Sequence, residues 1–352
     1  MQKIRVLIVD DSAVMRLRLK KILERDGEIQ VIDIAKDGQE ALRKIDAYKP
    51  QVVTMDVEMP VINGLDALRR IMDDYPLPVV MLSALTAQGT VETLKALELG
   101  AVDFIQKPGF GDGEALKQFE RDLPEKIKLA ARSIVRGKKK VIKNPEVLVP
   151  VKLPQIQQNH HIVLVAIGCS TGGPAALQQI IPVLPKDFPA PVVIVQHIPR
   201  GFTRPMAERL DKISNLKVVE GEDGMMIKAG QVCLAPAGSV FSLKKTGSAI
   251  EVQLDAHITR SAFKPSVDDM MLSVAEVCGE QALGVILTGM GNDGVQGLTA
   301  LKRRGGRVLA ESESSCVVFG MPKAAIDAGI VDQVVDISLM GQAIVRNVLN
   351  QA

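Results

Sequence analysis

The sequence contains no tryptophan, and aromatic residues make up only 3% of its 352 positions. A core built from these residues has to be aliphatic, and a hydrophobic content of 47% supplies enough side chains for it. Aliphatic cores suit helices packed on a parallel sheet better than an aromatic-rich β-sandwich. The length predicts about two domains, because a domain typically has roughly 100–200 residues.

The sequence also lacks an excess of charge, since 43 basic residues stand against 41 acidic ones and leave a net charge of +2. This balance gives no electrostatic reason to expect nucleic acid or a membrane surface as a partner. No apolar run approaches the roughly 20 residues that cross a bilayer. The first residues lead directly into a strand pattern rather than a secretion signal. We therefore expect a cytoplasmic protein that binds no nucleic acid and inserts into no membrane.

Closely spaced cysteines are absent as well. The four cysteines lie far apart and form no CxxC pair; they are Cys169, Cys233, Cys278 and Cys316. Such spacing predicts reduced, mostly buried thiols.

The first third of the chain contains a regular alternation of strand and helix patterns. Apolar runs that predict strands lie at residues 4–9, 30–35, 51–55, 78–82 and 101–105. Short connections between such strands and the intervening helices are typical of a doubly wound parallel sheet. A further helix is expected at residues 114–135, with a break near Pro124.

Polar residues end or follow several of these strands: Asp10, Asp11, Asp56, Ser83 and Lys107. Because the carboxyl ends of parallel strands share one edge of a sheet, we expect these five side chains to converge. Three neighbouring carboxylates repel one another and need a cation, and hard oxygen ligands suit Mg²⁺. A lysine and a hydroxyl beside them can hold the oxygens of a phosphoryl group. The cluster therefore predicts phosphoryl transfer onto a carboxylate.

A polar, proline-containing segment without periodicity follows and predicts a linker. The basic run at residues 136–140 is short and lacks interleaved aromatics, which favours a solvated hinge over a nucleic-acid patch. No helix-turn-helix pattern follows the linker. We expect a first domain at residues 1–122, a linker at 123–158 and a second domain at 159–352.

The second domain begins with an apolar run and the sequence GCSTGGP at residues 168–174. An apolar run ended by glycine predicts a buried parallel strand, and Pro174 suits the first turn of a helix. Ser170 would then lie on the sharp turn between them, at the carboxyl edge of the sheet, where an acyl-transfer nucleophile belongs. Taken alone, the G-x-S-x-G pattern favours a phosphate or anion loop instead.

Two more polar residues follow apolar strand patterns in this half, His197 and Asp293. A serine, a base and a carboxylate that orients the base form a catalytic triad, which is defined by geometry and not by chain order. The order serine, histidine, aspartate differs from that of the α/β-hydrolases, so the pattern does not imply that fold.

Three alternatives to this triad stay open. His257 is the second candidate for the base, and Asn292 is an alternative to the aspartate beside it. Cys169 competes as nucleophile because a thiol is intrinsically more nucleophilic. Strand alternation favours Ser170 pointing outward and Cys169 packed inside.

The remaining patterns of the second domain predict a mostly parallel, doubly wound α/β sheet with an antiparallel insertion. Alternating runs separated by Gly/Pro turns predict the insertion or a sheet edge, and they lie at residues 217–219, 232–235, 240–243 and 251–254.

The first domain resembles the receiver domains of two-component response regulators. The motifs that carry the resemblance are LIVDDS at 7–12, TMDVEMPVINGLDAL at 54–68, LSA at 82–84 and DFIQKP at 103–108. It implies a flavodoxin-like fold and a phosphorylated Asp56, with Mg²⁺ on Asp10, Asp11 and Asp56 and phosphoryl contacts from Ser83 and Lys107. It also implies that Phe104 takes the aromatic switch position, and it raises the expectation of a cis Lys107–Pro108 bond.

The second half resembles the catalytic domain of chemotaxis protein-glutamate methylesterases, the CheB family. Its matching motifs are AIGCSTGGP at 166–174, VIVQHIP at 193–199, APAG at 235–238 and ILTGMGNDG at 286–294. The resemblance implies hydrolysis of glutamate methyl esters on the cytoplasmic domains of chemoreceptors, and in many members deamidation of receptor glutamines. A chemotaxis histidine kinase is the implied phosphodonor.

Carried over residue by residue, the resemblance makes Ser170 the nucleophile, His197 the general base and Asp293 the group that orients it. The Thr171 hydroxyl and backbone N–H groups near Ser170 and Met290 are implied to hold the oxyanion or to position the base. Cys169 stands where a small residue is common, and we interpret it as an apolar substitute. No cofactor is implied for the esterase site.

The resemblance further implies that the unphosphorylated receiver covers the esterase site, and that phosphorylation of Asp56 shifts the population toward separated domains. Two other functions stay open from the residues alone. One is a phospho-regulated binding module that uses the Ser170 turn as an anion loop, and the other is a DNA-binding regulator.

Overall fold

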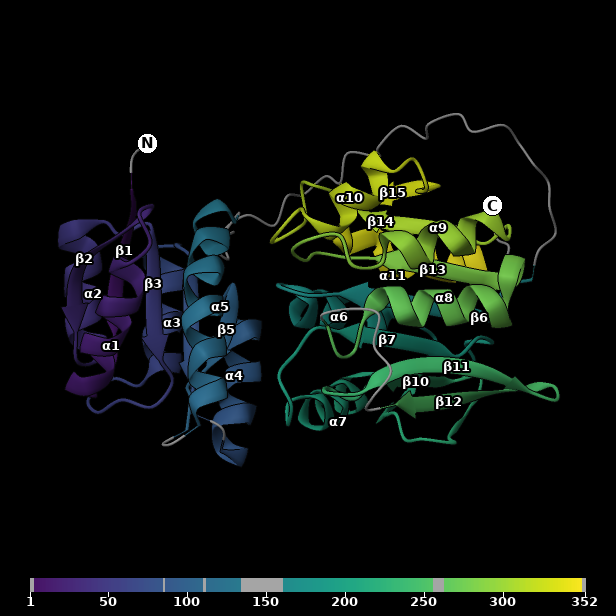
Figure 1. The fold of residues 1–352 in the computed structure, drawn as a ribbon, viewed down its shortest axis with the longest axis horizontal. Helices are drawn as coiled ribbons and strands as arrows, with labels where there is room; N and C mark the ends of the chain where they lie inside the picture. Colours follow the sequence, from purple (N-terminus) through teal and green to yellow (C-terminus); the bar gives the residue numbers. More distant parts are fainter. Residues whose placement is uncertain (1–2, 85, 110–111, 134–160, 256–262, 350–352) are drawn as a thin grey trace.

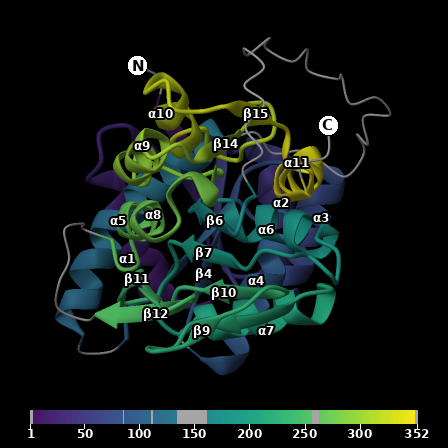
Figure 2. The same cartoon turned by 90° about the vertical axis from the view of Figure 1, so that its right-hand side faces the viewer.

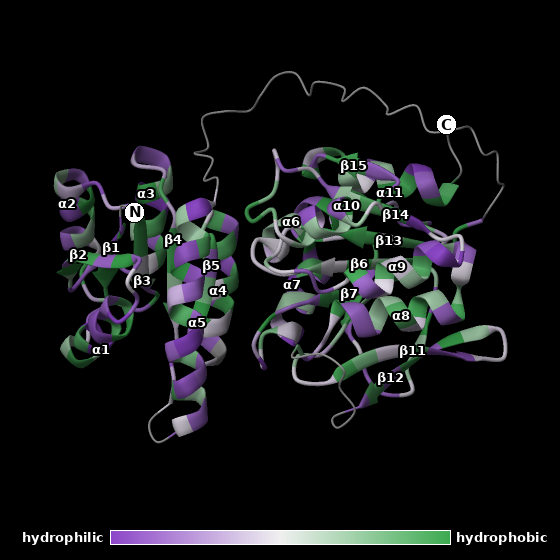
Figure 3. Cartoon of the chain, turned by 45° about the horizontal axis from the view of Figure 1, so that its top comes forward, coloured by the Kyte–Doolittle hydropathy of each residue, from purple (hydrophilic) through white to green (hydrophobic). Residues whose placement is uncertain are grey.

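The computed structural model describes residues 3–84, 86–109, 112–133, 161–255 and 263–349. They form two α/β units that lie side by side in Figure 1, the first in purple and blue and the second in teal to yellow. The main sheet of each unit is an apolar layer between helices, as the green strands in Figure 3 show. Within the described residues, no helix combines the length and the apolar content that crossing a membrane requires.

The first unit is a five-stranded parallel sheet in the order β2-β1-β3-β4-β5, which is the flavodoxin-like order. Its strands are β1 (Ile4–Val9), β2 (Ile29–Ala35), β3 (Val52–Asp56), β4 (Val79–Ser83) and β5 (Asp103–Gln106). Its helices are α1 (Ala13–Glu24), α2 (Gly38–Tyr48), α3 (Gly64–Asp74), α4 (Ala87–Leu99) and α5 (Gly113–Arg132). Alternate residues of β1 face two different apolar clusters, so helices cover the sheet on both sides.

Helix α5 corrects one expectation, because it continues through Pro124 without a break. Four buried residues on one face, Phe119, Leu123, Ile127 and Ala130, anchor it on both sides of the proline. Packing of this face outweighs the backbone hydrogen bond that the proline removes. The expected boundary at residues 122–123 therefore falls inside a helix. We propose that the first unit extends to Arg132 and that the linker begins after it.

The second unit is built on a seven-stranded parallel sheet in the order β15-β14-β13-β6-β7-β10-β8. These strands are β6 (Leu164–Cys169), β7 (Val192–Gln196), β8 (Lys217–Glu220), β10 (Gln231–Leu234), β13 (Ala282–Ile286), β14 (Arg307–Glu311) and β15 (Gln333–Val335). Its helices are α6 (Gly173–Ile180), α7 (Thr203–Ile213), α8 (Val267–Val277), α9 (Val295–Arg303), α10 (Met321–Asp327) and α11 (Ile337–Leu349). Short 3₁₀ turns lie at Ile181–Val183 and Gly279–Gln281.

The antiparallel insertion is smaller than expected. It consists of β9 (Met226–Ile227), β11 (Val240–Thr246) and β12 (Ala249–Asp255), which lie below the main sheet in Figure 2. The runs at 217–219 and 232–235 follow the second alternative, a sheet edge, because they form β8 and β10 and pair in parallel at the end of the main sheet. Helix α7 returns the chain after β7, so β8 can run in the same direction. Short alternating strands do not reveal this orientation in the sequence.

Chain order reverses at β6, which lies between β13 and β7 in the main sheet. The strands that follow β6 in the chain, β7, β8 and β10, lie on one side of it. The later strands, β13, β14 and β15, lie on the other side. Open α/β sheets bind ligands at such a switch point, beyond the carboxyl ends of the strands.

Candidate active site and phosphoryl site

Ser170 lies directly after β6, on the turn that leads into α6. Its N–H donates to the Thr288 carbonyl at 3.0 Å, and its carbonyl accepts from the Gly173 N–H at 2.8 Å. Gly172 has a φ of +83°, a left-handed conformation that glycine adopts without strain. Pro174 stands in the first turn of the helix, as expected. The turn therefore holds the serine at the carboxyl edge of the sheet.

Cys169 is packed beneath this turn and is fully buried. Its thiol lies 3.0 Å from Oε1 of Gln196. Burial, and after it the Glu311 carboxylate, raise the pKa of this thiol far above its ordinary value. A neutral, enclosed thiol is a poor nucleophile, so this geometry disfavours Cys169 and favours its neighbour Ser170.

Gln196 is a site residue that sequence reasoning missed. Its Nε2 donates to the carbonyls of Ser170 and His197, both at 2.9 Å. One buried amide thus ties together the two turns that carry the candidate nucleophile and base. The only sequence signal was a polar residue at the end of an otherwise apolar strand.

Strand pairing brings His197 beside Ser170. Cys169 is paired with Gln196 across β6 and β7, so the next residue of each strand leaves the sheet at the same edge. The His197 N–H donates to the Cys169 carbonyl at 3.0 Å. On the other side of β6, Asp293 reaches the same edge, and its Oδ2 lies 2.8 Å from Nε2 of His197. Asn292, the alternative, is exposed.

The carboxylate of Asp293 sits at the N-terminus of α8. It accepts N–H bonds from Val267 at 2.8 Å and Asp268 at 3.0 Å, and the Ser266 hydroxyl donates to it at 2.9 Å. Burial would raise the pKa of Asp293, but the bond and charge of His197 and the two N–H donors outweigh it and hold the pKa below its ordinary value. The carboxylate is therefore held ionised against the imidazole. Sequence reasoning missed this support, because only the fold brings α8 to Asp293.

The loop after β13 runs against the serine turn. A Cβ on Gly289 would lie 2.8 Å from Cβ of Ser170 and 2.3 Å from Sδ of Met321, so only glycine fits. Thr288 is held against the end of β14, because its N–H donates to the buried Glu311 carboxylate at 2.8 Å. Met290, which follows Gly289, is 42% exposed and faces the first unit.

The acidic cluster of the first unit forms as expected at the ends of β1 and β3. Ligand atoms of Asp10, Asp11 and Asp56 lie within 4.8 Å of one another. Nζ of Lys107 is 2.7 Å from both Asp10 and Asp56. Burial raises the pKa of Asp56 to about 6, although the charge and hydrogen bond of Lys107 act to lower it. Burial alone would lower the pKa of Lys107, but Asp56 and Asp10 raise it.

The donor set of this cluster fits a hard divalent cation, since it consists of carboxylate oxygens gathered at one point. Ser83 ends β4 next to the Asp56 end of β3, and its Oγ accepts from the Thr93 hydroxyl at 2.6 Å. The Lys107–Pro108 bond is not cis, contrary to expectation; among the described residues the cis bond is Lys264–Pro265.

Strand β5 and helices α4 and α5 of the first unit face the second unit (Figure 1). The Thr171 hydroxyl donates to Oδ2 of Asp103 at 2.6 Å, and Lys126 donates to the same oxygen at 2.6 Å. Phe104 packs against the fully buried Phe202, with ring centroids 4.6 Å apart. The residue after the candidate nucleophile is thus bound to a carboxylate of the other unit.

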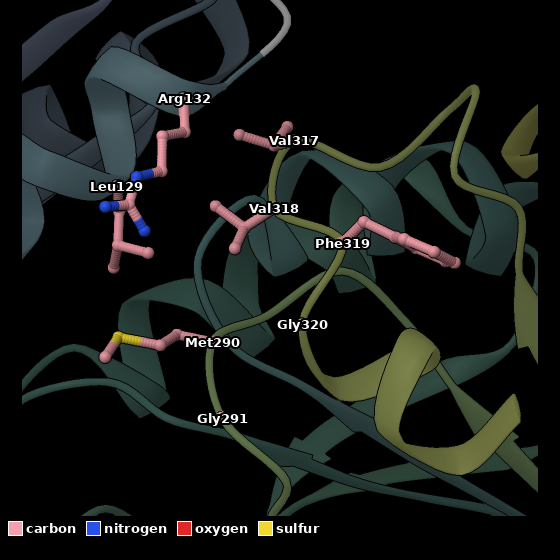
Figure 4. A pocket seen from close by; sticks show the side chains of 8 residues that line it. All are labelled: Leu129, Arg132, Met290, Gly291, Val317, Val318, Phe319 and Gly320. Carbon is pink, nitrogen blue, oxygen red and sulfur yellow. The ribbon is translucent and has the colours of Figure 1, made fainter. Parts of the chain in front are cut away.

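Two further contacts extend this interface. Glu98 of α4 forms an ion pair with Arg209 of α7. A cavity of about 300 Å³ lies where α5 meets the loops after β13 and β14. Figure 4 shows Leu129 and Arg132 facing Met290 and Val318 across it. His257, the second candidate for the base, and residues 134–160, most of the expected linker, lie outside the described residues.

Comparison with known proteins fits both halves. The family model for CheB methylesterase matches residues 165–344, and that for response regulator receiver domains matches 6–118. The protein-glutamate methylesterase/protein-glutamine glutaminase 1 of Carboxydothermus hydrogenoformans is 46% identical over 99% of this chain and 100% of its own length. The protein-glutamate methylesterase/protein-glutamine glutaminase of Lawsonia intracellularis is 44% identical over 97% of this chain and 98% of its own.

Among solved structures, the catalytic domain of Thermotoga maritima CheB methylesterase is 43% identical. The two structures superpose over 53% of this chain and 98% of the Thermotoga chain, with a TM-score of 0.52. Because a curated relative at 46% identity matches 99% of this chain, the protein belongs to the CheB methylesterase family. It joins a receiver domain to the methylesterase domain.

Proposed function

We propose that this protein hydrolyses glutamate methyl esters on the cytoplasmic domains of chemoreceptors and releases methanol. The observation that carries the proposal is the bond between His197 and Asp293 at the edge where Ser170 leaves β6. A hydroxyl, an imidazole and an ionised carboxylate at one edge are what acyl transfer needs. Family membership supplies the substrate class, because the relatives are named for this ester.

In the proposed reaction, Ser170 attacks the ester carbonyl as His197 takes the hydroxyl proton. Nε2 of the imidazole is held by Asp293, so the proton goes to Nδ1. The positive charge that forms on the ring is stabilised by the carboxylate. The imidazolium then gives its proton to the departing methoxide, and water hydrolyses the glutamyl ester of Ser170 with the same base. Attack on a glutamine carboxamide follows the same steps and releases ammonia.

The oxyanion of the tetrahedral intermediate forms between two loops, the Ser170 turn and the segment around Met290. Backbone N–H groups of these loops are our candidate donors. Gly289 supports this assignment, because its missing side chain lets the second loop approach Ser170 closely. Thr171 has a different role in the closed arrangement, where its hydroxyl is engaged by Asp103.

We propose that the receiver is phosphorylated at Asp56 by a chemotaxis histidine kinase, in the cytoplasm. Asp10, Asp11 and Asp56 would hold Mg²⁺, which neutralises charge on the transferred phosphoryl group. Lys107 already contacts two of these carboxylates and would bind a phosphoryl oxygen. The Ser83 hydroxyl, which now donates to the Ala84 and Gly89 carbonyls, would have to turn from them to make the second contact.

The unphosphorylated receiver inhibits the esterase in this proposal. Support comes from the contacts that β5 and α5 make beside the active site, above all Asp103 with Thr171. Phosphorylation of Asp56 would weaken them and shift the population toward an open enzyme.

Methanol release from methylated receptors, with and without a phosphodonor, tests the proposed function. We expect turnover that rises on phosphorylation, covalent capture of a serine-directed phosphonate at Ser170, and loss of both in Ser170→Ala. Near-normal demethylation by Ser170→Ala would refute the assignment. Phosphonate capture also separates the esterase from a binding module that uses the same turn as an anion loop.

A further inference from the structure

Phe263 is an unusual residue in a chain so poor in aromatics. Five other phenylalanines are almost entirely buried: Phe104, Phe119, Phe188, Phe202 and Phe241. Phe263 is 46% exposed, yet its ring stacks on the imidazole of His197. The ring centroids are 4.3 Å apart and the planes are inclined by only 9°. A half-exposed aromatic ring that lies flat on the candidate base requires an explanation beyond packing of the core.

A single hydrogen bond leaves the imidazole one degree of freedom. The bond from Nε2 to Asp293 holds one edge of the ring, but combined rotation about the side-chain torsions can still tilt the ring. Such a tilt would change the direction of Nδ1, the nitrogen that takes the Ser170 proton in the proposed reaction. A flat aromatic surface against the imidazole face opposes that rotation, because turning the ring breaks the stack.

The stack can also stabilise a positive charge on His197. During attack the imidazole of His197 becomes a cation, and the face of an aromatic ring attracts a cation placed over it. The interaction is therefore stronger in the transition state than in the resting enzyme, which is the condition for an effect on kcat. An aromatic pair of this kind typically contributes about 0.5–1.5 kcal/mol, which corresponds to about 2- to 10-fold in rate.

The segment that follows Phe263 is anchored at two points. Three residues later, the hydroxyl of Ser266 donates to the Asp293 carboxylate. Between them, the Lys264 carbonyl accepts the Gly238 N–H at 2.9 Å. One short segment thus holds the base through its ring face and the orienting carboxylate through a hydroxyl.

We propose that Phe263 is a positioning residue for His197, which holds the imidazole in the plane that it adopts on Asp293 beside the Ser170 turn and stabilises the imidazolium during ester hydrolysis. This inference rests on the proposed function. The sequence around Phe263 gave no sign of it, because a phenylalanine in the polar run SAFKPS matches no catalytic pattern.

The test compares Phe263→Leu and Phe263→Trp in the full chain, activated with a small-molecule phosphodonor. For Phe263→Leu we expect kcat for methanol release and the rate of phosphonate capture to fall together by about 2- to 10-fold, with KM unchanged. Phe263→Trp keeps an aromatic face and should restore both rates. The ring protons of His197 should also lose an upfield ring-current shift in Phe263→Leu. Ile213→Ala, a control at a similarly exposed apolar residue of α7, should change neither rate.

Two results would overturn the inference. If Phe263→Leu raises KM and leaves kcat and phosphonate capture intact, the ring contacts the receptor instead of positioning the base. If neither rate changes while the ring-current shift disappears, the stack has no role in catalysis. Wild-type turnover separates these results from a failure of the proposed function, since an inactive wild type would refute the function itself.

Discussion

Removal of the Asp103 carboxylate should activate the enzyme in the absence of phosphorylation. Asp103 lies on the receiver and accepts the Thr171 hydroxyl beside the candidate nucleophile, at 2.6 Å. Its other partners, Lys126 and the Phe104 N–H, belong to the receiver itself. In Asp103→Ala the closed arrangement therefore loses its hydrogen bond to the serine turn. The Thr171 hydroxyl is left without an acceptor in the closed state, whereas water can bind it in the open state.

The size of the effect follows from the type of bond. A hydrogen bond to a charged group contributes about 1.5–3 kcal/mol, and each 1.4 kcal/mol changes an equilibrium about tenfold. The open fraction of the unphosphorylated enzyme should thus rise by about 10- to 150-fold, as long as the closed form predominates. The Glu98–Arg209 pair and the Phe104–Phe202 contact remain. We accordingly expect partial activation and a further increase on phosphorylation.

The assay is initial-rate methanol release from methylated receptor, measured with and without phosphodonor. Asp103→Ala should show an elevated rate without phosphodonor and a normal rate with it. Lys44→Met is the matched control, because it removes an ion pair between Lys44 and Asp33 inside the receiver. If that control activates equally, general loosening of the receiver explains the result. A basal rate of Asp103→Ala equal to wild type would refute the reasoning.

Other perturbations have equally specific outcomes. A fragment starting at residue 161 should demethylate receptors without phosphodonor; a rate no higher than that of the unphosphorylated full chain would contradict inhibition by the receiver. Ser170→Ala should lower turnover by about 10⁴- to 10⁶-fold in the same assay. Cys169→Ala should retain activity, and Cys169 in the native enzyme should resist alkylation, because burial raises the pKa of that thiol. Burial likewise raises the pKa of Glu311 in the folded chain above its value in the unfolded chain. The wild type therefore loses stability as the pH rises from the unfolded pKa through the folded pKa. The melting temperature of Glu311→Gln relative to wild type should therefore increase with pH across that window, and a constant difference would contradict the shift.

Sequence patterns predicted the two sheets and the edges at which chemistry lies, because strand ends carry their own signal. Apolar runs that stop at Asp10 and Asp56 lead to one edge in the parallel sheet of the receiver, and these side chains do meet there. The same logic brought His197 and Asp293 to one edge of the second sheet. Such positions follow from local periodicity and from the geometry of parallel sheets.

The missed features depend on contacts between segments that are remote in sequence. For strands β8 and β10 the sequence left an antiparallel insertion and a sheet edge open, because a short alternating run looks the same in either direction. Asp103 is an ordinary strand residue until the fold brings Thr171 to it, 68 positions away. Phe263 and Ser266 gain their significance only through His197 and Asp293. No local pattern encodes a partner of this kind.

Strand β5 physically connects the phosphoryl site to the esterase site. Lys107, which follows the strand, contacts Asp56, and Asp103 at its other end contacts Thr171. At about 3.3 Å per residue, the two ends are about 13 Å apart on one extended segment. A phosphoryl group on Asp56 would give Lys107 a new partner, and a shift of β5 that followed would move Asp103 and Phe104 with it. The Asp103→Ala experiment examines this connection, because it removes the contact at one end of the strand and leaves Lys107 on Asp56 at the other.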